Sequence, residues 1–271
     1  MLENTSRKDS SSADFPHRPS IQAGRLEVRF AASSDELRAA QELRYKTLYI
    51  EAGGEPSEDM QRIGREQDEW DDVGIHVIVL DHSKEKQPVV GTLRLVSSLA
   101  LMEGQSFYTE KAFDLTNLRY RYEKILELSR FCIDPEGRNG SILMLIWKFT
   151  LQFIVAEKFE LMLGCASFQG KDVEQHRSIL SYLYQNNLAP PECQSPPVTA
   201  SHVKIEQLLQ GRANWADAKQ AVPTLLRGYL KVGAKITDTA IIDPIFNTVF
   251  VGIYVDAHDM VVQNHTLIRH Q

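Results

Sequence analysis

The sequence predicts a mixed α/β fold, with a mostly antiparallel sheet and helices before, between and after its strands. Two apolar runs at 76–81 and 88–96 are joined by a polar turn, which is typical of a β-hairpin. Residues 125–159 have the pattern of a strand, a short Gly-containing loop and a long apolar helix. Near the end of the chain, the runs TAIID and NTVFVGIYVD have the pattern of closing strands. No GxGxxG motif opens a βαβ unit, and the sequence has neither a P-loop nor a GxSxG elbow, so a Rossmann fold is excluded.

Composition and charge narrow the function classes. The 271 residues are 43% hydrophobic and 24% charged, which is typical of one large globular domain. The net charge of −6 and the absence of a basic stripe argue against a nucleic-acid partner. Cys132, Cys165 and Cys193 are widely spaced and lack a Cys-x-x-Cys or His-rich pattern, so we expect reduced thiols and no metal site. The N-terminus has no apolar signal-peptide core, and no apolar run of about 18 residues occurs, so we expect a cytoplasmic protein.

The first part of the chain is predicted to hold a tail, a strand and a helix. Residues 1–24 are polar and Ser-rich, and we expect a disordered tail. A short strand at 26–31 starts a single domain that we expect to span 25–256. A polar residue at 33–35 can then cap a helix that ends before Gly53.

The second part is predicted to extend the same sheet. Residues 107–124 are irregular or partly helical, and 159–168 form a buried strand followed by a helical stretch at 172–185. Residues 186–235 combine a Pro-rich loop with a helical extension, and 257–271 form a C-terminal tail.

Glu127 is the best candidate for a catalytic base. Its two leucine neighbours should partly desolvate it and raise its pKa. Period-two alternation places Glu127 and Ser129 on one face of the strand and Arg130 on the other. Because Arg130 can share a cleft with Glu127 only if the strand is irregular, we predict a β-bulge near Ser129. A structural, ion-paired glutamate is the alternative.

Arg94 lies in an apolar strand, where an unpaired charge is costly. It therefore needs a carboxylate, either from the acidic stretch at 66–72 or from a substrate, and Arg44 can join the same network. Asp68 and Asp71 could hold an amine-bearing substrate. A purely structural ion-pair network explains these residues equally well.

A family resemblance rests on seven short segments in a specific order. From about Val28 to Val255 the chain resembles the ornithine N-acyltransferase family of bacterial ornithine-lipid synthesis, within the GNAT-like acyltransferases. The segments are LRYKTLY (43–49), EQDEWDD (66–72), GTLRL (91–95), FYTEKAFDL (107–115), ELSRFCIDPEGRNG (127–140), LMLGCASFQG (161–170) and VPTLLRGYLKVGAKITDTAIID (222–243). The first segments are also similar to N-acyl-homoserine-lactone synthases, whose matching residues form a charged group at the catalytic cleft: Arg44, Asp68, Asp71, Arg94, Glu127 and Arg130. The chain departs from the family pattern at Phe250 and Gly252, which leaves the exact acceptor open.

The resemblance implies a GNAT-like fold and a phosphate-binding loop before the long helix. The loop is a reduced form of the family pattern Arg-x-x-Gly-x-Gly. Coenzyme A carries a pyrophosphate that needs several donors, whereas the pantetheine of a carrier protein has one phosphodiester, so we expect acyl carrier protein as the donor and no metal or other cofactor. Cys165 lies in an apolar strand, where thiols are usually inert. We expect donor contacts at Phe131, Arg138, Asn139, Gly140, Ser141 and Cys165.

The resemblance also implies the reaction. A (3-hydroxy)acyl group would pass from acyl carrier protein to the α-amine of L-ornithine and give lyso-ornithine lipid. Glu127 would remove a proton through a water, with Ser129 and Arg130 beside it, and N–H groups of the central strand would hold the oxyanion. The alternatives are a homoserine-lactone synthase, acylation of another amine, a coenzyme A-dependent acetyltransferase and a non-catalytic acyl-binding module.

Two surfaces are predicted to serve this reaction. We expect peripheral contact with the inner face of a membrane, through exposed apolar residues, because the product is amphiphilic. For the acidic carrier protein we expect a basic patch, with solvated surface charge as the alternative: Arg119, Arg121 and Lys124, with contributions from Arg138, Lys148 and Lys231.

Overall fold

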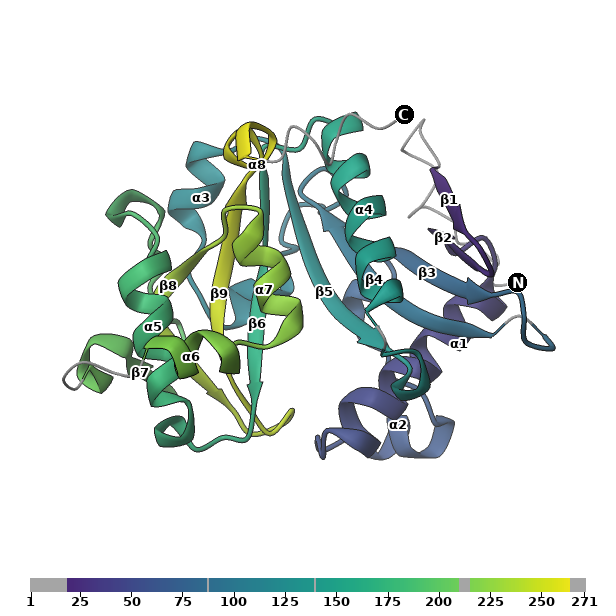
Figure 1. Cartoon of the computed structure of the whole chain (residues 1–271), viewed down its shortest axis with the longest axis horizontal. Coiled ribbons are helices and arrows are strands. Elements are labelled where there is room, and N and C mark those ends of the chain that lie inside the picture. Colours follow the sequence, from purple (N-terminus) through teal and green to yellow (C-terminus); the bar gives the residue numbers. More distant parts are fainter. Residues whose placement is uncertain (1–18, 87, 139, 210–214, 264–271) are drawn as a thin grey trace, which may run out of the picture.

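The computed structural model describes residues 19–86, 88–138, 140–209 and 215–263. Its nine strands form one sheet in the order β1-β2-β3-β4-β5-β6-β9-β8-β7 (Figure 1). All neighbours are antiparallel except β5 and β6. The predicted mixed, mostly antiparallel α/β fold is therefore confirmed. The strands are β1 Ser20–Ala23, β2 Leu26–Phe30, β3 Ile75–Asp81, β4 Val89–Ser97, β5 Ile125–Ile133, β6 Leu161–Gln169, β7 His202–Lys204, β8 Lys235–Asp243 and β9 Thr248–Asp256.

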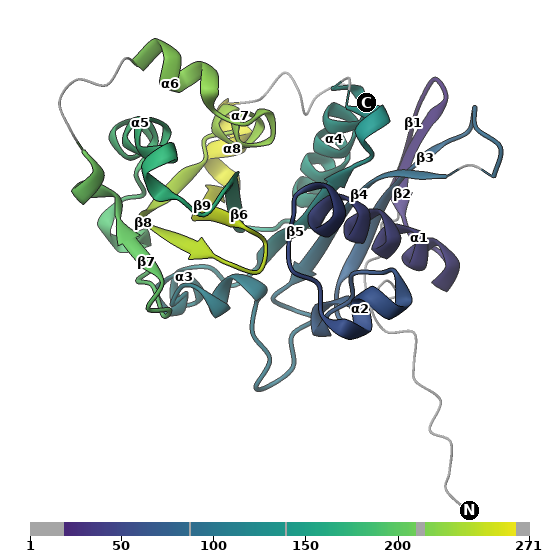
Figure 2. The same ribbon diagram turned by 90° about the horizontal axis from the view of Figure 1, so that it is seen from below.

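Helices cover both faces of the sheet. Figure 2 shows α4, α5 and α7 on one face and α1, α2 and α3 on the other. On the first face, apolar residues of α4 pack with those of the strands in the main core, including the edge-to-face pairs that Phe30 makes with Phe149 and Phe153. The helices are α1 Ser34–Tyr45, α2 Glu58–Ile63, α3 Thr116–Arg121, α4 Ser141–Ala156, α5 Arg177–Asn187, α6 Trp215–Ala221, α7 Thr224–Lys231 and α8 Ala257–Gln263.

The predicted helix after β2 has two parts. Ser33 caps α1, because its hydroxyl accepts a hydrogen bond from the N–H of Glu36 at 3.2 Å. After Tyr45 the chain continues as a π-helical segment, η1 Lys46–Glu51, a rare geometry that is frequent at functional sites. The sequence predicted the helix but gave no sign of this change in its winding.

Two elements lie where tails were predicted. Strand β1 falls within 1–24 and pairs with β2 around a turn at Gly24, whose φ is +60°. Helix α8 falls within 257–271 and is anchored by Met260, which is fully buried. Both elements are short, and their stability comes from contacts with the sheet that local composition does not reveal. Residues 1–18 and 264–271 lie outside the described residues.

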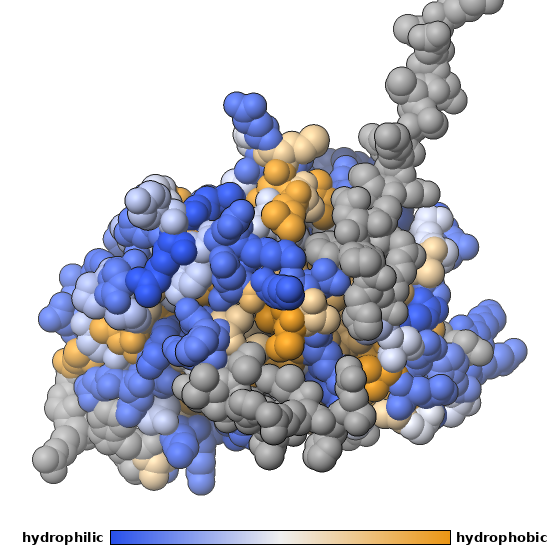
Figure 3. Space-filling model, turned by 90° about the horizontal axis from the view of Figure 1, so that it is seen from above, coloured by the Kyte–Doolittle hydropathy of each residue, from blue (hydrophilic) through white to orange (hydrophobic). Residues whose placement is uncertain are grey.

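The surface is mainly polar on the side where α8 lies. Seen from above, hydrophilic residues cover most of this face, and hydrophobic residues gather in a narrow band near its middle (Figure 3). Within the described residues, no helix is both long enough and apolar enough to cross a bilayer.

The sheet splits at its centre. Strands β5 and β6 pair from Ile125↔Leu161 to Leu128↔Gly164 and then separate, while β6 stays paired with β9 along its whole length. A Cβ atom at Gly164 would lie 2.5 Å from the carbonyl oxygen of Leu128, so this last pair requires glycine. The two strands diverge towards the end of the sheet where α4 begins (Figure 1).

Candidate active site

A β-bulge lies in β5 directly after the last pair with β6. The register with β4 changes from Arg94↔Ser129 to Thr92↔Cys132, so β5 holds one extra residue there. Arg130 has a φ of +56°, which is rare for a residue with a side chain. The bulge predicted near Ser129 is confirmed, and it brings Arg130 into the same network as Ser129 and Arg94.

Three arginines and three carboxylates form an ion-pair network beside the bulge. At its buried centre, Asp71 accepts from Nη1 of Arg44 at 2.8 Å and from Nη1 of Arg94 at 2.7 Å. The side chains of Arg44, Arg94 and Asp71 are at most 3% exposed. Burial opposes the ionisation of Asp71, but the two guanidinium groups outweigh it and hold its pKa well below the usual range. Of the predicted acceptor-binding residues, these three lie behind the site, with their charges already paired.

The outer part of the network is accessible. Arg130 donates from Nε to Glu66 at 2.8 Å and from Nη2 to Asp68 at 2.9 Å, and Asp68 also pairs with Arg94. The guanidinium carbon of Arg130 lies 4.4 Å from the ring centroid of Tyr108. The side chains of Asp68 and Arg130 are 16% and 9% exposed. These are the two network members that could touch a substrate.

Glu127 is fully buried next to this network. Its carboxylate accepts hydrogen bonds from the backbone N–H groups of Tyr108 at 3.0 Å and Thr109 at 2.7 Å, at the start of the 3₁₀ helix η3 Tyr108–Lys111. Burial raises its pKa, and the hydrogen bonds of Thr109 and Tyr108 only partly oppose this. Direct contact with a substrate is blocked, because Thr109 and Cys165 line the neighbouring cavity and Glu127 does not. The shift of pKa is in the predicted direction, while the role as base stays a prediction.

A cavity of about 240 Å³ occupies the split in the sheet. Ser129, Arg130 and Phe131 form its β5 wall. Arg130 and Phe131 have no register partner in β4 or β6, strands that are described along their whole length. Their main-chain groups are therefore candidate donors for the carbonyl oxygen of a thioester.

The other walls come from segments distant in the sequence. Cys165, Ser167 and Gln169 lie on one face of β6, as period-two alternation requires. Leu128 of β5 also lines the cavity, and the remaining lining residues come from η1 and its C-cap, η3, α7, the end of β8, the β8–β9 turn and β9: Leu48, Ala52, Tyr108, Thr109, Leu225, Tyr229, Asp243, Phe246, Thr248 and Phe250. Several segments that are distant in the sequence thus form the wall of the cavity.

Comparisons with known proteins identify the family of the chain. The family described as acetyltransferase (GNAT) domain matches residues 43–148. The L-ornithine N(alpha)-acyltransferase of Agrobacterium fabrum is 34% identical, over 83% of this chain and 78% of its own. That of Rhodobacter capsulatus is 30% identical, over 86% of this chain and 91% of its own. The chain belongs to the L-ornithine N(alpha)-acyltransferase family. Among solved structures, the homoserine-lactone synthase LasI covers 94% of this chain with 11% identity and a TM-score of 0.45.

The protein is thus an acyltransferase enzyme of this family, with a GNAT-type fold. Cys165 lies on the cavity wall, where burial raises its pKa to about 12. A thiol with this pKa is protonated at neutral pH and is a poor nucleophile. Its position suits contact with an acyl donor, as predicted, better than covalent catalysis.

The predicted phosphate loop of this acyltransferase lies at the start of α4. Gly140 is the N-cap, with a φ of +89°, and Ser141 is the first helical residue. Arg138 pairs with Glu51 of η1 through both guanidinium Nη atoms, and its Nε donates to the carbonyl oxygen of Ile133 at 3.2 Å. Asn139 lies outside the described residues. Arg138 can bind a phosphate only if it shares or gives up Glu51.

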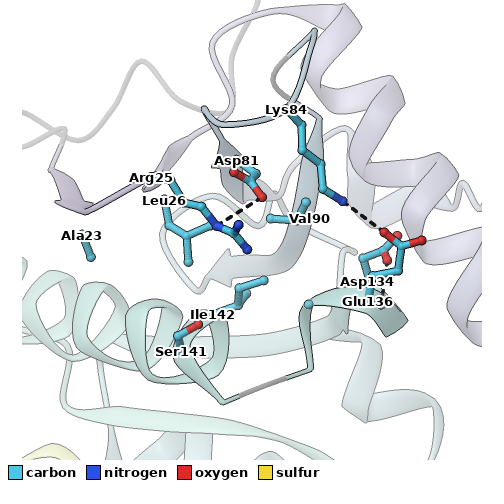
Figure 4. A pocket seen from close by; sticks show the side chains of 11 residues that line it. Ala23, Arg25, Leu26, Asp81, Lys84, Val90, Asp134, Glu136, Ser141 and Ile142 are labelled. Carbon is cyan, nitrogen blue, oxygen red and sulfur yellow. Dashed lines mark hydrogen bonds and ion pairs between the residues drawn. The ribbon is translucent and has the colours of Figure 1, made fainter.

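A second cavity, of about 480 Å³, lies beside this loop (Figure 4). Its charges are already paired: Lys84 lies 3.1 Å from Glu136, and Arg25 lies 3.6 Å from Asp81. None of the predicted catalytic residues lines it. Ser141, which was predicted to contact the acyl donor, does line it, whereas Ser129 and Arg130 of the predicted catalytic residues line the smaller cavity.

The basic residues predicted for the carrier protein fall into two groups. Arg119 and Arg121 lie on α3, and Lys124 lies just before β5, near the opposite end of the sheet from the start of α4 (Figure 1). Lys148 on α4 and Lys231 on α7 are exposed. Helix α7 also lines the cavity, so the second group is on an element next to the site.

Several cavity residues were missed by the sequence reasoning. Asp243, Thr248 and Gln169 are single polar residues at strand ends, and Tyr229 lies in a short helix. Gln169, Tyr229 and Asp243 lie within segments that carry the family resemblance, but no site role was assigned to them, and Thr248 lies outside those segments. A hairpin signal around Pro244 could have placed Asp243 and Thr248 side by side, but nothing in the sequence brings that hairpin against β5.

Proposed function

We propose that this enzyme transfers a fatty acyl group from acyl carrier protein to the α-amine of L-ornithine, giving lyso-ornithine lipid. The observation that carries the proposal is the cavity between the diverging strands, with the bulge residues Arg130 and Phe131 on its wall. The names of the relatives supply the acceptor.

In this proposal the amine attacks the thioester directly. The thioester carbonyl lies in the split, and its oxygen accepts from a main-chain N–H of the bulge as negative charge develops. The C–N bond forms, the C–S bond breaks, and pantetheine leaves as a thiol. No acyl-enzyme forms, which agrees with the raised pKa of the Cys165 thiol.

The proton passes from the amine to Glu127 through the hydroxyl of Thr109 and then returns to the leaving sulfur. Thr109 lines the cavity, contacts Glu127 through its backbone N–H, and its Oγ1 lies 3.7 Å from Sγ of Cys165. The raised pKa of Glu127 makes it a better proton acceptor than an ordinary carboxylate. This side-chain path is our alternative to the water-mediated path expected from the sequence.

The short loop before α4 favours a carrier-protein donor. The loop offers Arg138, Gly140 and Ser141, which suit one phosphodiester better than a pyrophosphate. We place the docking surface at Lys148 and Lys231, because α4 and α7 lie in contact: the rings of Trp147 and Tyr229 are 4.6 Å apart and edge-to-face, and Tyr229 lines the cavity.

Mass spectrometry of purified components tests the proposal. The enzyme is incubated with L-ornithine and either acyl carrier protein thioester or the matching coenzyme A thioester. We expect N-acylornithine mainly with the carrier protein. If coenzyme A serves equally well, the proposed donor is wrong, and if ornithine is not acylated with either, the proposed function is wrong.

Charge reversal locates the donor. We expect Lys148→Glu with Lys231→Glu to raise KM for the carrier-protein thioester about tenfold and to leave KM for the coenzyme A thioester unchanged. Arg121→Glu on α3 is the matched control and should change neither. If only the control variant raises KM for the carrier-protein thioester, the carrier protein docks at α3 instead.

A further inference from the structure

Asp243 stands out among the residues that line the cavity. Among the carboxylates of the described residues, only Asp243 lines the cavity. The lining does not include the nearby carboxylates Glu66, Asp68, Asp71 and Glu127. The Oδ1 atom of Asp243 accepts from the N–H groups of Ile245 at 2.8 Å and Phe246 at 3.1 Å. Within the described part of the chain, its Oδ2 has no hydrogen-bond or ion-pair partner. The turn therefore fixes a negative charge that faces the cavity and is not neutralised.

Asp243 belongs to a row of polar side chains across three strands. The register pairs Gln169 of β6 with Thr248 of β9, and Thr248 with Asp243 of β8, so the three side chains share one face of the sheet. All three line the cavity. Thr248 is 7% exposed, and its hydroxyl has no hydrogen-bond partner among the described residues. A buried, unpartnered hydroxyl next to a free carboxylate indicates a site for a hydrogen-bond donor.

The opposite wall carries a positive charge. Arg130 lines the same cavity, and its guanidinium carbon lies 5.1 Å from the ring centroid of Phe246, the residue whose N–H holds Asp243. The Nη1 atom of Arg130 makes no ion pair with a described carboxylate, because its partners use Nε and Nη2. Burial is the main reason why the pKa of Tyr108 is raised, and the charge of Asp243 adds to it across the cavity. The cavity thus presents one anionic and one cationic group to a zwitterionic ligand.

We propose that Asp243, with Thr248, binds the side-chain ammonium of the amino-acid acceptor and so selects a diamino acid. The inference rests on the proposed function, because it assigns the two ends of that acceptor. Arg130 then binds the α-carboxylate, and the α-amine points towards the split. A carboxylate next to the α-amine would keep it protonated and unreactive, so Asp243 suits the ammonium that does not react.

Strand geometry supports this assignment. Arg130 lies two residues beyond the last β5–β6 pair, and Gln169 lies five residues beyond it. At about 3.3 Å per residue the polar row is therefore about 10 Å further along the strands than Arg130. This offset separates the main chains only, and the Arg130 side chain reaches towards Asp243, with its guanidinium carbon 5.1 Å from the ring centroid of Phe246.

Two acceptors that differ in one group test the inference. L-Ornithine is compared with L-2-aminopentanoate, which has the same carbon chain and no side-chain amine, using one acyl donor. Asp243→Asn keeps the Oδ1 acceptor for the turn and removes the charge. We expect kcat/KM for ornithine to fall about 10- to 100-fold, as for the loss of one charged hydrogen bond, while kcat/KM for 2-aminopentanoate changes less than about threefold.

Two further variants separate binding from folding. Asp114 holds a similar turn, because its Oδ1 accepts from the N–H of Thr116 at 2.9 Å. Asp114→Asn is therefore the control, and it should leave kcat/KM for both acceptors unchanged. Thr248→Val removes an unpartnered hydroxyl, so we expect it to lower kcat/KM for ornithine severalfold without lowering Tm.

The outcomes distinguish the inference from the proposed function. Suppose that the wild-type enzyme acylates ornithine. If Asp243→Asn still prefers ornithine to 2-aminopentanoate, or lowers kcat/KM equally for both acceptors, the inference is overturned and the proposed function stands. If the wild-type enzyme acylates neither amino acid, both fail.

Discussion

Replacing Glu127 by glutamine tests the proton path through the buried side of the site. The carboxylate oxygens accept from Tyr108 N–H at 3.0 Å and Thr109 N–H at 2.7 Å. An amide keeps one acceptor and presents an N–H₂ group to the other donor. It also removes the charge whose burial raises the pKa of Glu127.

The magnitude follows from these contacts. One unsatisfied buried N–H costs about 1–3 kcal/mol, and removal of the buried charge offsets part of this. At about 2–4 °C per kcal/mol, Tm should fall by less than about 12 °C, so the variant stays folded at 25 °C. Loss of a general base should lower kcat by about 10²- to 10⁴-fold.

The assay is the pH dependence of kcat/KM with saturating acyl donor. In the wild-type enzyme, kcat/KM should fall as pH decreases through the raised pKa of Glu127, because the protonated acid cannot accept a proton. Glu127→Gln should lack this decrease. Thr109→Val keeps the backbone hydrogen bond and removes the hydroxyl, so it should lose a similar part of the rate. If Glu127→Gln retains kcat within about threefold, Glu127 only positions η3 and the proton path is wrong.

The remaining predictions concern the ion-pair network and the split. Asp71→Asn leaves Arg44 and Arg94 incompletely paired, so we expect a loss of about 3–5 kcal/mol and a Tm lower by about 6–20 °C at pH 7 by calorimetry; an unchanged Tm would contradict the role of the network. Folding lowers the pKa of Asp71 from its ordinary value of 3.8, so the ionised carboxylate stabilises the folded protein above pH 3.8, and this contribution is lost progressively at lower pH. The difference in Tm between Asp71→Asn and the wild type should therefore narrow as pH falls to about 3. Gly164→Ala places a Cβ 2.5 Å from the carbonyl oxygen of Leu128. We expect the variant to be destabilised by about 1–3 kcal/mol and to have a lower kcat, because the two strands must move apart. A normal Tm and kcat would show that the split tolerates a side chain.

Local patterns predicted the elements well where they were long and periodic. The hairpin of β3 and β4, the strand–loop–helix unit of β5 and α4, and the two closing strands all occur near the predicted residues. The bulge in β5 was also predicted, but from the expectation that Glu127 and Arg130 face one cleft, whereas Arg130 lines the cavity and Glu127 does not. In these cases a single segment contained the necessary information.

Features that depend on distant segments were not predictable. Asp243 and Arg130 are far apart in sequence, and only the order β5-β6-β9-β8 brings them to one cavity. Sequence reasoning also placed Arg44 in the acceptor site, as a possible member of the network of Arg94, and it left open whether the carboxylates of that network came from the protein or from a substrate. The structure supplies Glu66 and Asp71 instead. Pairing of this kind is decided by tertiary packing, not by spacing.

The central claim is that acyl transfer takes place in the cavity between β5 and β6. Ser167 is exposed on the β6 wall, so Ser167→Trp should fill the cavity without disturbing the core, and Ser178→Trp on the exposed side of α5 is the control. Formation of N-acylornithine is measured by mass spectrometry, together with Tm. We expect Ser167→Trp to lower the rate at least about 100-fold with Tm unchanged, while the control keeps the wild-type rate. A Ser167→Trp enzyme with the wild-type rate would show that the reaction takes place elsewhere.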